Sequence, residues 1–344
     1  RGAVGAMSDF GDLSLSLETD TQNAGGAMES WAVLADGSLQ HRPMNIQIGE
    51  FGLRDGKSKS EFSPADIEVD QTNLLGRGAG GVVARGRHKP TGLPLAVKVV
   101  RVEDKAKRSQ LINELHYLLQ IAKSAFLIHL YDAYIHKHTG CVHVVLEYMD
   151  YGSLADVKKQ SQKVPENMLA LMLMQILEGL KTLHLESVVH RDVKLENILV
   201  NSQGFVKVTD FGISKKLGDT SFCDTFVGTQ IYMSPERVLG EGYSFAADIW
   251  SLGLCVYELA CGSSAYGRVT SYPILFDNLV SKPEPRLPED KFSPGLCDFV
   301  SRQLQRNPEK RSTAIQLQAH RWILDSMATE WEFVDWLRRL MQER

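Results

Sequence analysis

The chain has 344 residues and a net charge of −4; 43% of its residues are hydrophobic and 23% are charged. This is the composition of a globular protein long enough for more than one core, and the small net charge argues against nucleic acid or an anionic membrane as partner. The five cysteines form no CxxC pair, which predicts reduced intracellular thiols. The most apolar stretch, 249–261, is shorter than the roughly 20 residues that span a bilayer, so we expect no membrane span and a cytoplasmic or also nuclear location.

Residues 1–65 are rich in Gly, Ser, Asp and Gln and hold few apolar clusters. Such a composition buries little apolar surface, so we expect a mostly flexible arm. Short apolar runs follow at 67–75, 81–87 and 95–102, and the Gly and Pro between them predict a meander of strands. The period then becomes helical, at Leu111, Leu115, Leu118 and Ala122.

Two more strand-like runs, 128–134 and 142–148, precede a mainly helical half. Within that half, 168–184 and 248–261 are apolar nearly all round, which is typical of buried helices. The sequence therefore predicts an α+β fold: a small β-rich N-lobe that carries one helix, and a larger, mainly α C-lobe.

A glycine-rich loop joins the first two predicted strands. Gly76, Gly78 and Gly81, followed by Val83, have the spacing GxGxxGxV. Glycines let the backbone approach phosphates closely, although glycine-rich hairpins without a ligand share this spacing. A dinucleotide site would need a helix directly after the glycines, and here a strand-like run follows. The loop is therefore a candidate phosphate site of another type.

Lys98 ends the next apolar run, Leu95-Ala96-Val97. Lysines at such positions commonly extend to solvent, but a lysine oriented by an acidic side chain can contact the α- and β-phosphates of ATP. Glu114 stands in the apolar part of the following helix and can be that partner; a solvated glutamate is the ordinary alternative.

The segment His190-Arg191-Asp192-Val193-Lys194-Leu195-Glu196-Asn197, with Asp210-Phe211-Gly212 further on, carries the chemistry. Phosphoryl transfer depends on positioning and on neutralising charge. Asp192 can accept the proton of a substrate hydroxyl, and Lys194 can neutralise charge on the transferred phosphoryl group. Asn197 and Asp210 supply the oxygen ligands that Mg²⁺ prefers. Together with the glycine loop and Lys98, in this order, these residues form the signature of a kinase.

On these motifs, residues 69–323 resemble the eukaryotic protein kinase domain. The resemblance implies a bilobal fold that uses ATP and Mg²⁺, with a kinase domain over 66–323, an N-lobe over 66–147, a C-lobe over 150–323 and a helical tail over 324–344. Lys194, at its position in the segment 190–197, resembles the lysine of serine/threonine kinases. The resemblance also implies a nucleotide site that contains Gly76, Gly78, Gly81, Val83, Ala96, Lys98, Glu114, the gatekeeper Leu146, the hinge residues Glu147 and Met149, and the pocket floor Leu199.

Three further roles follow from the same resemblance. Glu236, in Ser234-Pro235-Glu236, is expected to pair with Arg311, and Asp248 to anchor the backbone of the catalytic loop. Four side chains are expected to stack between the lobes in the active state: Leu118, Leu130, His190 and Phe211.

The segment 226–237, Phe-Val-Gly-Thr-Gln-Ile-Tyr-Met-Ser-Pro-Glu-Arg, is similar to the MAP kinase kinase family. That family implies phosphorylation of Thr and Tyr in the activation loop of a MAP kinase, and activation by an upstream MAP kinase kinase kinase. The chain departs from the family at Leu195, where proline is usual, and lacks the proline-rich insert of some members after Gly262. Alternatives are a Ser/Thr kinase of another branch of the cascade and a pseudokinase scaffold; Lys98, Asp192 and Asp210 argue against the scaffold.

The family's spacing indicates Ser221 and Thr225 as activating phosphorylation sites, with Thr220 possible in place of Ser221. A phosphate there adds about −1.5 to −2 charges that Arg191 could bind, with Lys215 and Lys216 nearby in sequence.

A docking role is a further hypothesis for the N-terminal arm. The segment 41–43, His-Arg-Pro, precedes Ile46-Gln47-Ile48 and resembles a MAP kinase docking motif, although a short strand packed on the N-lobe fits equally well. The tail 331–341 is a rival partner site, because Trp331, Val334, Leu337 and Met341 share a helix face.

Overall fold

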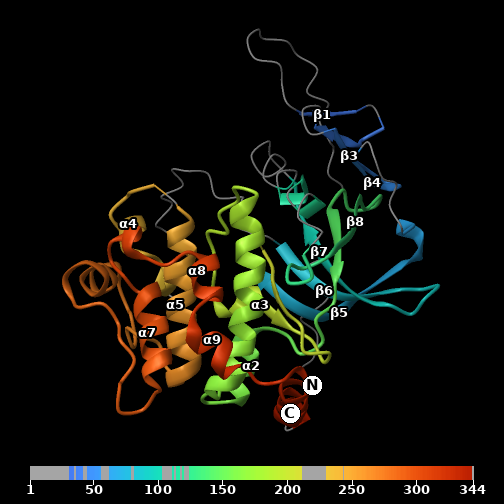
Figure 1. The fold of residues 1–344 in the computed structure, drawn as a ribbon. Helices are drawn as coiled ribbons and strands as arrows, with labels where there is room; N and C mark the ends of the chain where they lie inside the picture. The colour runs from blue at the N-terminus through green and yellow to red at the C-terminus, as the bar shows by residue number, and fades with distance from the viewer. Residues whose placement is uncertain are drawn as a thin grey trace, which may run out of the picture. The chain divides into compact units, whose positions relative to one another are not determined.

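The computed structural model describes residues 31–34, 36–41, 45–55, 62–78, 81–102, 111, 114–116, 118–119, 124–210, 230–242 and 244–342 (Figure 1). The chain divides into two compact units. Unit 1 contains Arg1–Leu119 and His129–Tyr148, and unit 2 contains Gln120–Ile128 and Met149–Arg344. Unit 1 is rich in strands and unit 2 in helices, so the predicted α+β class is confirmed.

Unit 1 is built on a five-stranded antiparallel sheet with the order β5-β6-β7-β9-β8. One face of the sheet forms a core around Leu95, Val97, Tyr134 and Val145, and Phe62 packs against it. Of the predicted helix, residues 111, 114–116 and 118–119 are described and helical. The strands are β5 (Ile67–Gly78), β6 (Gly81–His88), β7 (Pro94–Val100), β8 (Leu130–Ile135) and β9 (Val142–Glu147).

A second sheet lies before the kinase motifs, where the sequence suggested a flexible arm. Its four antiparallel strands are β1 (Trp31–Val33), β2 (Leu39–His41), β3 (Ile46–Gly49) and β4 (Gly52–Arg54). The sequence pattern was too short to reveal it, because β2, β3 and β4 each contribute only one or two apolar residues to the buried face.

Of the proposed docking motif, the described residues His41 and Ile46–Ile48 lie in strands β2 and β3 of this second sheet. Ile46 and Ile48 are 1% and 0% exposed, so they are not available to a partner protein in this conformation. The alternative interpretation, a short strand packed on its own kinase unit, is therefore the one that the structure supports.

Unit 2 is organised around two buried helices, α3 (Glu166–Leu185) and α5 (Phe245–Cys261), which lie side by side (Figure 1). Among the described helices, α3 is long and apolar enough to cross a membrane, but most of its residues are buried against neighbours such as α8 and α9, as in the core helix of a globular unit. The other elements are α2 (Leu154–Gln160), η2 (Leu195–Asn197), β10 (Ile198–Val200), β11 (Val206–Val208), η3 (Gln230–Tyr232), α4 (Pro235–Val238), α6 (Tyr272–Phe276), the π-helix η4 (Asp277–Ser281), α7 (Pro294–Gln303), η5 (Pro308–Lys310), α8 (Ala314–Gln318), α9 (Arg321–Ser326) and α10 (Glu330–Gln342).

The tail is helical over α10, and most of its apolar stripe packs on unit 2. Phe333, Leu337 and Met341 are buried, and α10 contacts α2 and α3. Trp331 differs from the expected common face, because 73% of it is exposed.

Candidate active site

The glycine loop lies at the turn between β5 and β6, where Gly78 pairs with Gly81 and residues 79–80 lie outside the described part. Gly81 has φ +122°, and a Cβ there would come 2.2 Å from the Val99 carbonyl oxygen, so the hairpin itself requires glycine. A Cβ on Gly76 would meet no atom within 4 Å. The space beside Gly76 is therefore open, which fits the close approach of a phosphate.

Lys98 and Glu114 form the predicted ion pair. Lys98 Nζ donates to Glu114 Oε1 at 2.9 Å, and the two side chains are 10% and 15% exposed. Lys98 is paired with Val83 of β6, which places it on the strand next to the glycine loop. Since a buried ammonium group needs a counter-charge, Glu114 fixes the orientation of Lys98.

The predicted adenine-binding residues are placed by strand register. Ala96 of β7 pairs with Leu146 of β9, and both are buried. Glu147 ends β9 in unit 1, and Met149 begins the second segment of unit 2, so the predicted hinge is the last point where the chain passes from one unit to the other. Leu199 is half-buried in β10.

Three predicted residues converge in the catalytic loop. Asp192 Oδ2 accepts hydrogen bonds from Lys194 Nζ at 2.9 Å and from Asn197 Nδ2 at 3.0 Å. The same Asn197 amide group donates to the backbone carbonyl of Asp192 at 2.9 Å. The side chains of Asp192 and Lys194 are about one fifth exposed, so the carboxylate is oriented but accessible.

Asp248 of α5 holds the start of this loop, as the resemblance implied. Its side chain is 1% exposed and accepts the backbone N–H groups of His190 and Arg191, each at 2.9 Å. These bonds stabilise Arg191 at φ +70°, a conformation that costs energy for a residue with a side chain.

His190 is a buried link between the loop and Thr209, the residue directly after β11. Burial lowers the pKa of His190, so the ring is neutral. Its Nε2 donates to the carbonyl oxygen of Thr209 at 3.0 Å, which leaves Nδ1 to accept the N–H of Asp192 at 3.2 Å. The position of Asp192 thus depends on the neutral form of His190.

Asn197 and Asp210 fit the predicted metal site by their chemistry. Both amide contacts of Asn197 Nδ2 go to Asp192, so the Asn197 Oδ1 atom is the one suited to a cation. Asp210 is exposed, has φ +53° and follows Thr209, whose N–H donates to the Asn197 carbonyl. Among the described residues no cluster of three or more His, Cys, Asp or Glu could hold a metal alone, and Mg²⁺ commonly completes its shell with phosphates and water.

A further group of residues, which the sequence did not reveal as a set, fixes the segment η3. Tyr232 Oη donates to Glu258 Oε2 at 2.7 Å, and the Tyr232 carbonyl accepts from Ser251 Oγ at 2.7 Å. Lys158 of α2 forms an ion pair with Oε1 of the same glutamate. Burial, with the nearby Cys255 and Glu258, raises the pKa of Tyr232, so its hydroxyl remains a donor. In the sequence, the sign of this group was Glu258, an acidic residue inside the apolar segment 249–261.

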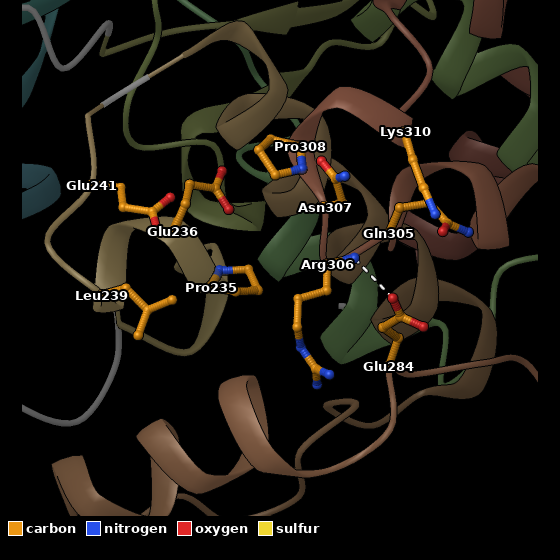
Figure 2. A pocket seen from close by; sticks show the side chains of 10 residues that line it. All are labelled: Pro235, Glu236, Leu239, Glu241, Glu284, Gln305, Arg306, Asn307, Pro308 and Lys310. Atoms are coloured by element: carbon orange, nitrogen blue, oxygen red, sulfur yellow. Dashed lines mark hydrogen bonds between the residues drawn. The ribbon is translucent and has the colours of Figure 1, made fainter.

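Glu236 and Arg311 form the predicted pair through two hydrogen bonds of 2.6 and 2.7 Å. Burial alone would raise the pKa of Glu236, but the hydrogen bonds and charge of Arg311 outweigh it and lower the pKa. Figure 2 shows the surface hollow beside this pair, in which the backbone N–H of Arg306 donates to Glu284 at 2.8 Å. None of the predicted catalytic or nucleotide-binding residues lines it.

Several predicted residues lie outside the described part of the chain. These are the three candidate phosphorylation sites Thr220, Ser221 and Thr225, the nearby Lys215 and Lys216, and Phe211 of the expected stack. Leu118, Leu130 and His190 of that stack are buried in their own units, and the stack itself stays a prediction.

Comparison with known proteins agrees with these motifs. Residues 69–323 match the family described as protein kinase domain. The chain is 38% identical over 268 residues to mitogen-activated protein kinase kinase 3 of Arabidopsis thaliana, covering 77% of this chain and 52%, about half, of that protein. It is 39% identical over 328 residues to the mitogen-activated protein kinase kinase SIPKK of Nicotiana tabacum, covering 91% and 90%. It is 38% identical over 273 residues to mitogen-activated protein kinase kinase 1 of Arabidopsis thaliana, covering 77% and 76%. The chain is a protein kinase and belongs to the mitogen-activated protein kinase kinase family.

Proposed function

We propose that the chain phosphorylates both a Thr and a Tyr in the activation loop of a MAP kinase, with ATP as phosphate donor. The observation that supports this most strongly is the assembled catalytic loop, in which Asp192 is held by Lys194 at 2.9 Å and by Asn197 at 3.0 Å. The relatives are named mitogen-activated protein kinase kinases, and these names indicate a MAP kinase as the substrate.

The chemistry follows from the position of these side chains. The hydroxyl oxygen of the substrate forms a bond to the γ-phosphorus of ATP, the bond from that phosphorus to the bridging oxygen breaks, and ADP leaves. Asp192 accepts the hydroxyl proton, and Lys194 reduces the negative charge around the transferred group. Lys98, oriented by Glu114, contacts the α- and β-phosphates.

Asn197 and Asp210 are the residues that would hold a divalent ion, and we infer Mg²⁺ from their oxygen donors. Such an ion would neutralise the charge that develops on the phosphates. The side chains themselves contribute orientation, because the amide nitrogen of Asn197 is already fixed on Asp192.

We also propose that an upstream MAP kinase kinase kinase activates the chain by phosphorylating Ser221 and Thr225, with Thr220 as the alternative first site. The support is the spacing of these residues and the guanidinium of Arg191, whose backbone is held in place by Asp248. Kinase activity distinguishes this function from a pseudokinase scaffold, and the choice of substrate distinguishes it from a kinase of another branch.

The test is a phosphorylation assay with ATP and Mg²⁺ on a panel of catalytically inactive MAP kinases. The proposal expects phosphate on both the Thr and the Tyr of at least one activation loop, and none with the Asp192→Asn variant. Phosphate on Ser or Thr alone, or on none of these activation loops, would contradict it.

A further inference from the structure

One face of helix α5 holds both the catalytic loop and the segment η3. Asp248, Ser251 and Glu258 lie on this face, because residues three and seven positions apart return to the same side of an α-helix. Asp248 accepts two backbone N–H groups of the catalytic loop, each at 2.9 Å. Ser251 Oγ donates to the carbonyl oxygen of Tyr232 at 2.7 Å, and Glu258 Oε2 accepts the hydroxyl of the same tyrosine at 2.7 Å. The position of η3 relative to the loop is therefore set from α5.

The residues that follow η3 contact the catalytic loop directly. Arg237 of α4 donates from its guanidinium to the backbone carbonyl of Arg191 at 3.2 Å, and Ser234, which lies just before α4, is 0% exposed. Asp192 follows Arg191 and is the group that must meet the acceptor hydroxyl, and phosphoryl transfer depends on the position of the reactants. An acceptor protein that reaches Asp192 must therefore fit against the segment 230–237, so its affinity depends on how firmly that segment is held.

Lys158 of α2 pairs with the carboxylate that holds Tyr232. Its ammonium group forms an ion pair with Glu258 Oε1, and the two side chains are 25% and 10% exposed. A carboxylate so far removed from water needs a counter-charge, and Lys158 supplies it. Because Oε1 is bound to Lys158, Oε2 is turned towards Tyr232. One carboxylate thus joins a cation from α2 to a hydroxyl from η3.

Helix α2 is itself firmly placed, which makes Lys158 a fixed point. The helix begins with a capping box, in which the side chains of Ser153 and Asp156 accept each other's backbone N–H groups, and it contacts η2 at the end of the catalytic loop. The next residue, Lys159, differs: its side chain is 71% exposed and pairs with Asp156 of the same helix at 3.0 Å. Exposed pairs of this kind contribute little to stability. Two successive lysines of α2 therefore form a matched pair, one bound to the buried Glu258 and one on the surface.

We propose that Lys158 is a positioning residue for the protein substrate: it orients the Glu258 carboxylate on the Tyr232 hydroxyl and so keeps η3 in the conformation that receives the acceptor. Lys158 acts on the reaction only through Glu258. The inference goes beyond the proposed function, because it names a residue outside the kinase motifs on which recognition of the acceptor depends. It rests on kinase activity alone and holds for whichever protein receives the phosphate.

The test is a double-mutant cycle in the full chain, with KM for the acceptor protein and KM for ATP measured separately. The acceptor is a catalytically inactive MAP kinase, and myelin basic protein serves as a second, general acceptor. We expect Lys158→Met to raise KM for either acceptor roughly 3- to 30-fold, the size of a coupling through packed side chains, and to leave KM for ATP unchanged. Lys158→Arg should restore most of the affinity, and Lys159→Met is the control that should leave both constants unchanged. In a Tyr232→Phe background, Lys158→Met should add little, because the hydroxyl through which it acts is gone.

Three outcomes overturn the proposal: an unchanged KM for the acceptor in Lys158→Met, an equal rise in both KM values, or an equal effect of Lys158→Met in the Tyr232→Phe background. Phosphate on myelin basic protein but on no MAP kinase would contradict the proposed substrate class only, since the cycle is then read on myelin basic protein.

Amide hydrogen exchange gives a second readout that needs no turnover. In Lys158→Met we expect faster exchange over 230–234 and unchanged exchange in α3, and in Lys159→Met no change in either segment. Unchanged exchange over 230–234 in Lys158→Met, or equally faster exchange in both segments, would contradict the proposal. If Lys158→Met does not fold, as judged by circular dichroism, Lys158→Gln replaces it under the same criteria.

Discussion

Asp248 binds the backbone N–H groups of both His190 and Arg191, one with each carboxylate oxygen. The catalytic loop is therefore held by a side chain of α5, the most deeply buried helix of unit 2, and the strained backbone of Arg191 is stabilised from the core. Chemistry at Asp192 thus depends on a residue that touches no substrate.

Replacing Asp248 by Asn should weaken this support, because the amide nitrogen of Asn would face a backbone donor. An unsatisfied buried donor costs about 1–3 kcal/mol, and we expect that loss in urea unfolding together with a lower kcat. Ser251→Ala on the same helix is the control for stability, since it removes a hydroxyl that does not contact the loop. Unchanged kcat in Asp248→Asn would show that the loop holds its conformation without the carboxylate.

Replacing Asp192 by Asn should remove the base while keeping a side chain of the same size between Lys194 and Asn197. A positioned general base contributes about 10²–10⁴ in rate, so kcat should fall by that factor while the affinity for ATP stays the same. Single-turnover kinetics and equilibrium nucleotide binding measure the two quantities. A variant with kcat within a few-fold of the parent would disprove the assignment.

Tyr232→Phe should loosen the segment η3 by removing the hydrogen bond to Glu258. A single buried hydrogen bond contributes about 0.5–1.5 kcal/mol, and Glu258 also loses a partner. We expect a raised KM for the protein substrate with an unchanged KM for ATP, because Lys98 and Glu114 lie in unit 1. Steady-state kinetics with each substrate varied separately make the comparison, and a parallel rise in both KM values would count against the idea.

Breaking the buried pair Glu236–Arg311 should be one of the most damaging single changes in unit 2. Arg311→Met leaves the Glu236 carboxylate buried without its cation, which typically costs about 3–5 kcal/mol. The double variant Glu236→Leu/Arg311→Met removes both charges and should be more stable than Arg311→Met alone. Thermal and urea unfolding of the parent, the double variant and the two single variants Glu236→Leu and Arg311→Met test this, and a strictly additive double variant would argue that the pair is not coupled.

His143 makes the stability of unit 1 depend on pH. Burial, and then the charge of His136, lower the pKa of His143 from 6.5 to about 4, and its ring stacks on that of His136 at 4.9 Å. The unfolded chain therefore binds more protons between these two pH values. The stability that unit 1 gains from keeping His143 neutral is complete above pH 6.5 and is lost as the pH falls towards 4.

The titration of His143 alone lowers the free energy of unfolding by about 3 kcal/mol between pH 6.5 and pH 4. Urea unfolding of the parent and of His143→Phe at pH 7.5 and pH 4.5 isolates it, because all other titrating groups are common to both proteins. The parent should lose more stability on acidification than the variant. The exposed His138→Phe serves as control and should follow the parent, and identical pH profiles of all three would refute the prediction.

The pair Lys98–Glu114 was predicted from the chemistry of phosphate binding, and the pair Glu236–Arg311 was predicted from the resemblance to the protein kinase domain. The contact of Glu258 with Lys158 could not be foreseen in this way. The partners of Glu258 lie on two elements far apart in the chain, α2 and η3, and in the sequence the glutamate only interrupts an apolar helix.

The N-terminal sheet escaped prediction for a different physical reason. An alternation such as Leu39-Gln40-His41 spans three residues, which is too short to separate a strand from a polar loop. That these strands fold together is seen only from their pairing with one another and from the buried Asp132, whose carboxylate accepts the backbone N–H of Leu53. Local pattern therefore found the long elements and missed a structure that depends on distant contacts.

Gly204, at φ +85° between β10 and β11, lies so close to α10 that a Cβ there would come 2.8 Å from Val334. Helix α10 and the N-terminal sheet both lie outside residues 69–323, which match the kinase domain. A fragment cut to those limits would leave the surfaces under Phe333, Leu337 and Ile48 facing water, and newly exposed apolar patches promote aggregation. For recombinant work the cooperative folding unit is thus longer than the segment that the family shares, and expression boundaries should be chosen to include residues 31–342.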